Sequence, residues 1–84
     1  MRTVIVSVTA EDIRDGLACN GLKCPIAKAM YRLGHEHWEI IVPEITSEEG
    51  DFTTMLPPEA ERFACMFDNG EPVEPFYFTI ELPE

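Results

Sequence analysis

The chain has 84 residues, of which 45% are hydrophobic, and its sixteen acidic and six basic side chains give a net charge of −10 at pH 7. A chain of this length forms a single domain, residues 1–84, with a thin core, and its hydrophobic content excludes intrinsic disorder. The acidic balance disfavours direct binding to nucleic acids and to anionic membranes, because like charges would meet.

The charge is distributed unevenly along the sequence. Residues 33–84 contain thirteen acidic residues and one basic residue, Arg62, so their net charge is −12. Residues 1–32 contain five basic and three acidic residues, so their net charge is +2. A polyanionic segment of this size favours a basic protein partner.

The first predicted elements are a strand and a short helix. Residues 3–9 are rich in β-branched side chains, with valines at alternate positions, which predicts a half-buried strand. Thr9 can cap a helix of barely two turns, since Asp12 lies three residues further on. We expect Gly16 to end this helix in the left-handed conformation.

A second helix and a second strand follow. Pro25 suits a first helical position, and Ile26, Met30 and Leu33 recur at the spacing of one buried helical stripe. Gly34 is the expected end of this helix. Residues 37–42 place Trp38, Ile40 and Val42 on one face and Glu39 on the other, which predicts a strand that ends at the following proline.

The second half of the chain predicts a strand, a helix and a strand. Residues 43–50 have the composition of an acidic turn, and residues 52–56 can form a third strand antiparallel to the second. Residues 57–70 contain an apolar helical stripe, and residues 76–82 alternate as a strand. The expected order is β-α-α-β-β-α-β. We therefore expect an α+β fold, a mainly antiparallel four-stranded sheet with helices on one face.

The three cysteines are an odd number, so they cannot all pair within the chain. No signal-peptide pattern is present, and we therefore expect a cytoplasmic location in a host cell.

Cys24 precedes Pro25 at a helix start, where the helix dipole lowers a thiol's pKa. We expect no cofactor and no metal, because the cysteine spacing matches no redox motif. The weak candidate zinc ligands are Cys19, Cys24, His35 and His37.

No recognisable catalytic motif is present, so we expect no enzymatic activity and assign no catalytic residues. Twelve negative charges correspond to about 20 Å of duplex DNA at about 1.7 Å per charge. An acidic face can thus imitate a short duplex, although a surface coat that only maintains solubility gives the same pattern. The predicted partner-binding residues are the acidic side chains exposed by alternation or turn position: Glu36, Glu39, Glu44, Glu48, Glu49, Asp51, Glu59, Asp68, Glu71 and Glu74.

Two segments carry a resemblance to known proteins. They are residues 24–30, CPIAKAM, and residues 56–82, LPPEAERFACMFDNGEPVEPFYFTIEL. Together with residues 8–13, VTAEDI, they resemble a family of small proteins encoded by bacteriophages and prophages, over nearly the whole chain. The resemblance implies a phage setting and transfers neither an activity nor site residues.

Small acidic phage proteins include inhibitors of host nucleic-acid enzymes, anti-CRISPR proteins among them. By this analogy, we expect a protein that blocks a host partner with a basic nucleic-acid-binding groove, such as a CRISPR effector subunit. Two alternatives remain open: a thiol- or zinc-dependent small regulatory protein, and a homodimeric accessory protein of a mobile element. The dimer predicts that Tyr31, Trp38 and Tyr77 lie on an exposed patch.

Overall fold

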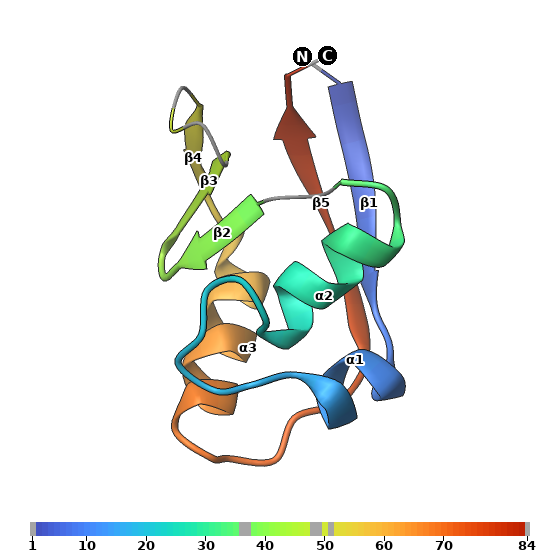
Figure 1. Ribbon diagram of the computed structural model, residues 1–84, viewed down its shortest axis with the longest axis vertical. Helices are drawn as coiled ribbons and strands as arrows, with labels where there is room; N and C mark the ends of the chain where they lie inside the picture. The colour runs from blue at the N-terminus through green and yellow to red at the C-terminus, as the bar shows by residue number, and fades with distance from the viewer. Residues whose placement is uncertain (1, 36–37, 48–49, 51, 84) are drawn as a thin grey trace.

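The computed structural model describes residues 2–35, 38–47, 50 and 52–83, which form helices and two small antiparallel sheets (Figure 1). The predicted α+β class is confirmed. The predicted single four-stranded sheet is wrong, because the strands pair as one sheet of two strands and another of three. The helices therefore do not cover one face of a common sheet.

The two ends of the chain pair in the smaller sheet. Strand β1 (Arg2–Val8) runs antiparallel to β5 (Phe76–Leu82) over its full length. The register places Val6 opposite Phe78, and both side chains are buried, as the alternation in each segment predicts. The outer face of this sheet is exposed.

The second sheet contains β2 (Trp38–Ile41), β3 (Glu44–Ser47) and β4 (Thr53–Met55), in that order. Strand β3 lies within residues 43–50, which we expected to form a turn, and it separates the two strands that we expected to pair. The burial of Ile45 between outward-facing neighbours explains this strand, because one apolar side chain anchors it to the core. Its acidic neighbours obscured that pattern in the sequence.

Helices α1 (Ala10–Asp15), α2 (Pro25–Arg32) and α3 (Pro58–Asp68) fall in the predicted segments. Helix α2 contacts both β1 and β2 and so connects the two sheets. Both α2 and α3 bury an apolar face in one common core, although Leu33, predicted on the α2 stripe, is exposed. Within the described residues, none of the helices has the length and apolar character needed to cross a lipid bilayer.

Helix α1 begins with the predicted capping box. The Asp12 N–H donates to Thr9 Oγ1 at 3.2 Å, and the Thr9 N–H donates to Asp12 Oδ2 at 2.9 Å. The predicted left-handed end at Gly16 is wrong, because its φ is −74°. Glycine is needed there for close approach instead, since an added Cβ would lie 2.7 Å from the Pro25 ring.

The buried Asp12 carboxylate also ties α1 to its neighbours. Arg32 Nη2 donates to Asp12 Oδ2 at 3.0 Å and to the Ser7 carbonyl at 2.7 Å, so one guanidinium joins α2, α1 and β1. Burial acts to raise the pKa of Asp12, but the hydrogen bonds from Arg32 and Thr9 and the charge of Arg32 outweigh it. The pKa of Asp12 therefore lies below its usual value.

Replacing this carboxylate tests its contribution to stability. We expect Asp12→Asn to lower the free energy of unfolding by about 1–2 kcal/mol at pH 7, because Arg32 loses its charged partner. The folded-state pKa of Asp12 is lowered, so its contribution is present above about pH 4 and is lost as the pH falls through that folded-state value. Urea titrations of both proteins at pH 7 and pH 2.5 measure the difference.

The matched control is Asp15→Asn, because Asp15 pairs with Arg14 at 3.1 Å on the exposed side of the same helix. We expect the control to have the smaller effect at pH 7, since water screens an exposed pair. If wild type and Asp12→Asn differ in free energy of unfolding by the same amount at both pH values, the ionised Asp12 carboxylate is not the stabilising group.

Candidate functional site: a cleft beside the 19–24 loop

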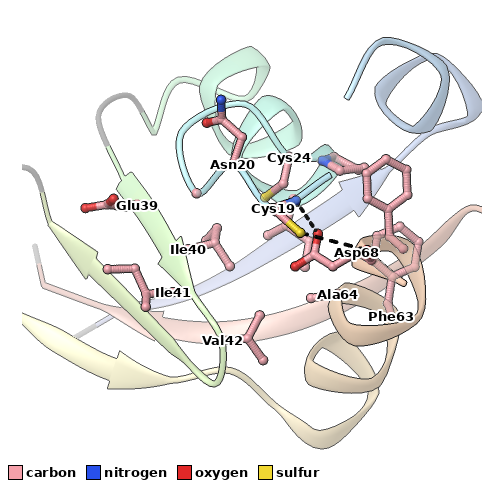
Figure 2. Close-up of a pocket in the computed structure, with 14 residues that line it drawn as sticks. Cys19, Asn20, Cys24, Glu39, Ile40, Ile41, Val42, Phe63, Ala64 and Asp68 are labelled. Carbon is pink, nitrogen blue, oxygen red and sulfur yellow. Dashed lines mark hydrogen bonds between the residues drawn. The ribbon is translucent and has the colours of Figure 1, made fainter. Parts of the chain in front are cut away.

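A cleft of about 420 Å³ lies between β2, α3 and residues 19–24 (CNGLKC), which we call the 19–24 loop (Figure 2). Its apolar wall comes mainly from β2 and α3, and among the described residues no basic side chain lines it. The described acidic residues that line it are Glu39 on β2 and Asp68 at the end of α3. The residues that line the cleft include Cys19, Cys24, Ile40, Val42, Phe63 and Asp68.

The loop is attached to β2 by a backbone hydrogen bond. The Ile40 N–H donates to the Gly21 carbonyl at 2.8 Å. This donor is available because β2 is an edge strand of its sheet, so one side of its backbone has no neighbouring strand. The approach requires glycine, since a Cβ on Gly21 would lie 2.6 Å from the Ile40 carbonyl oxygen.

The loop is attached to α3 through Asp68. The Cys19 N–H donates to Asp68 Oδ1 at 2.8 Å, and the Cys19 thiol lies 3.8 Å from the Asp68 carbonyl oxygen (Figure 2). A carboxylate in the last turn of a helix opposes the helix dipole, and that turn of α3 has no basic residue. The hydrogen bond from Cys19 compensates for this position. Asp68 therefore fixes the loop as well as carrying charge.

Cys24 caps α2 and is buried. Its sulfur accepts the Ala27 N–H at 3.5 Å, as the N-cap of the helix. Burial raises the pKa of the Cys24 thiol more than the N–H groups of the helix start lower it, and the charge of Asp68 adds to the rise. The expected lowering of this pKa is wrong, because the sequence showed the helix start but not the burial.

The candidate metal ligands do not assemble. Cys19 and Cys24 line the cleft, whereas His35 lies after α2, where burial and the nearby charge of Arg2 lower its pKa. His37 lies outside the described residues. Among the residues that the structure does describe, no group of three or more His, Cys, Asp or Glu side chains is arranged to hold a metal ion.

The predicted acidic residues that are described lie on and around α3 and the three-stranded sheet. Glu39 and Asp68 are half-buried and line the cleft. Glu59 and Glu74 are exposed and line a second groove, between α3 and residues 72–76, together with Arg62. The other exposed members are Glu44 and Glu71; Glu36, Glu48, Glu49 and Asp51 lie outside the described residues.

Basic residues gather elsewhere. Lys23, Lys28 and Arg32 line a separate hollow beside α1 and α2, which also contains three acidic side chains. In Figure 1, α1 lies on the opposite side of the molecule from α3 and the three-stranded sheet. These three basic residues thus come from α2 and the 19–24 loop, whereas Arg62 is on α3.

The aromatic residues expected on an exposed dimer patch differ in their exposure. Tyr31 and Tyr77 are exposed. Trp38 is half-buried and packs edge-on against Phe52, with 5.9 Å between the ring centroids. Trp38 therefore does not join the exposed patch that the dimer hypothesis requires.

Sequence reasoning missed the cleft because its walls come from three separate segments. One local signal was available in Asn20 and Gly21, a dipeptide typical of tight turns. The Asn20 Oδ1 atom accepts the N–H groups of Leu22 and Lys23, both at 3.1 Å, and folds the loop back toward α2. This turn predicts a compact loop but not the surfaces against which it packs.

No known family model, curated protein or solved structure matches this chain.

The attachment of the loop to β2 can be tested at Gly21. We expect Gly21→Ala to lower the free energy of unfolding by about 1–3 kcal/mol, because the added methyl group must displace the backbone of Ile40. Amide hydrogen exchange at Ile40 should accelerate in the same variant. The control, Leu22→Ala, removes an exposed side chain from the same loop and should change stability by less than about 0.5 kcal/mol. Equal stability of Gly21→Ala and wild type would refute the close approach.

The environments of the thiols predict their order of alkylation. Cys19 and Cys65 are exposed, whereas Cys24 is buried and has a raised pKa. We expect iodoacetamide at pH 7.5 to modify Cys19 and Cys65 at least tenfold faster than Cys24, because alkylation needs an accessible thiolate. Peptide mapping by mass spectrometry over time measures the three rates. Modification of Cys24 first would revive the reactive-thiol hypothesis.

Proposed function

We propose that the protein is a non-enzymatic inhibitor that binds a basic, nucleic-acid-handling host protein through the acidic surface around α3 and the three-stranded sheet. A CRISPR effector subunit is the most specific candidate partner, by analogy with acidic phage inhibitors. The observation that carries the proposal is the pattern of ion pairing. Among the described residues, the two ion pairs are Arg14–Asp15 and Arg32–Asp12, both within the first 32 residues.

The acidic residues of the described parts of 38–75 therefore keep their charge unpaired. Glu44, Glu59, Glu71 and Glu74 are exposed, and none of them forms an ion pair within the described chain, although Arg62 lines the same groove as Glu59 and Glu74. The molecule measures 33 × 21 × 19 Å, so its long axis exceeds the roughly 20 Å of duplex that carries twelve charges. A groove of Lys and Arg residues would bind this surface as it binds phosphates, with strong salt dependence.

A dimeric accessory protein is the second candidate, and one observation favours it. Ile5 and Tyr77 are 62% and 71% exposed, and they lie diagonally across the outer face of the β1–β5 pair. Apolar side chains on an exposed sheet face can be covered by another chain.

The thiol-dependent alternative loses support, since Cys24 is buried and serves as a helix cap.

The proposal can be tested by affinity capture from host lysate that contains active CRISPR systems. The test variant, Glu59→Gln/Glu71→Gln/Glu74→Gln, removes three exposed charges beside α3. We expect its apparent affinity for the captured protein to fall about tenfold, at about 0.2–1 kcal/mol per exposed charge pair, and its salt dependence to weaken.

The matched control, Glu11→Gln/Asp15→Asn/Glu81→Gln, removes the same number of exposed charges from α1 and β5. We expect this control to bind the captured protein with the same apparent affinity as wild type. Equal losses in both variants would show that only net charge matters, and capture insensitive to both salt and substitution would refute the acidic interface. Recovery of the bait alone, as a dimer, would favour the second candidate.

A further inference from the structure

We propose that the cleft beside the 19–24 loop receives a lysine side chain of the basic partner. The source of this side chain rests on the proposed function, whereas the site can be tested with a free ligand. The proposal depends on the shape of the cleft, the composition of its walls and the position of one carboxylate.

The walls of the cleft fit an alkyl chain. Val42 and Phe67 line the cleft and are half-buried, so they present apolar surface to it. The lining residues Ile40, Phe63 and Ala64 are almost fully buried in the core, which orders these walls. The four methylene groups of lysine bury along such surfaces while the ammonium group remains with polar partners. A volume of about 420 Å³ lies within the usual range for ligand sites, about 300–1,000 Å³, and exceeds what one side chain needs.

Asp68 supplies the polar partner. In Figure 2 its carboxylate lies beside Cys19 and opposite Ile40 across the cleft, whereas Glu39 lies on β2 away from Asp68. One oxygen of Asp68, Oδ1, accepts the Cys19 N–H, and within the described residues no other donor is bonded to this carboxylate. Asp68 is therefore held in place by the loop and keeps acceptor capacity for an ammonium group.

The charge of the cleft favours a cation over other ligands. Of the residues that the structure describes, two acidic and no basic side chains line it, so an anionic ligand would meet repulsion. A single partly engaged carboxylate suits the compact charge of an ammonium group better than the planar, bidentate fork of a guanidinium. These features select lysine from the two basic side chains.

The test uses Nα-acetyl-lysine methylamide and ¹⁵N-labelled protein, with binding followed by amide chemical shifts. We expect saturable shifts that centre on Cys19, Ile40 and Ala64, with a dissociation constant in the millimolar range, which corresponds to about −4 kcal/mol. Nα,Nε-diacetyl-lysine methylamide, which lacks the charge, should bind at least threefold more weakly. Equal binding of the two ligands would overturn the proposal, as would shifts centred outside the cleft.

Asp68→Asn tests the carboxylate while retaining an oxygen that can accept the Cys19 N–H. We expect at least threefold weaker binding of the lysine ligand by this variant. Glu71→Gln, an exposed charge removed outside the cleft, should bind like wild type. The spectra themselves report whether each variant is folded. Unchanged binding by folded Asp68→Asn would overturn the role of Asp68.

The two proposals fail separately. If the acidic triple variant loses the host partner but the lysine ligand leaves the cleft unperturbed, the lysine site is wrong and the acidic interface stands. If the ligand binds the cleft but host capture ignores both salt and the triple substitution, the site stands and the proposed inhibitor function is wrong.

Discussion

The attachment of the 19–24 loop at two points is the interaction on which the cleft depends. The Gly21 carbonyl accepts a hydrogen bond from β2, and the Cys19 N–H donates one to the last residue of α3. These bonds join a segment of the weakly basic first part of the chain to β2 and α3, which contribute Glu39 and Asp68 to the cleft. The two sheets share no hydrogen-bonded strands in the described parts of the chain, and this loop and α2 both link the N-terminal elements to β2.

The two ion pairs engage basic residues away from the acidic residues around α3. Arg14 and Arg32 are engaged with acidic residues of their own part of the chain, so they do not neutralise the described carboxylates around α3. Arg32 also binds the Ser7 carbonyl, which makes it part of the packing of α1, α2 and β1. The described acidic residues around α3 and the three-stranded sheet thus take part in no ion pair, a distribution that suits electrostatic recognition of a basic surface.

Local patterns in the sequence predicted most elements because each depends on neighbouring residues. The alternation in residues 3–9 and 76–82, the capping box at Thr9 and Pro25 at a helix start all have their predicted structure. Strand β3 was missed because its evidence is a single buried side chain, Ile45, among acidic neighbours. The pairing of β1 with β5 joins opposite ends of the chain, a contact that no local pattern encodes.

The site was less predictable than the fold for a related physical reason. Cys24 was placed correctly at a helix start, but its pKa is set chiefly by burial, which depends on the segments packed against it. Gly16 was singled out for a backbone angle, whereas the structure requires it for contact with Pro25. Asp68 was predicted as a surface charge, and its bond to Cys19 arises only when α3 and the loop meet.

The measurement that tests the central claim most directly is competition between this protein and duplex DNA for a purified captured partner. Fluorescently labelled duplex would be titrated with the protein at several salt concentrations. If the acidic surface takes the place of nucleic acid, the duplex should be displaced completely, one inhibitor per binding groove, with an inhibition constant that equals the directly measured dissociation constant and rises steeply with salt. A stable ternary complex of partner, duplex and this protein would contradict the account.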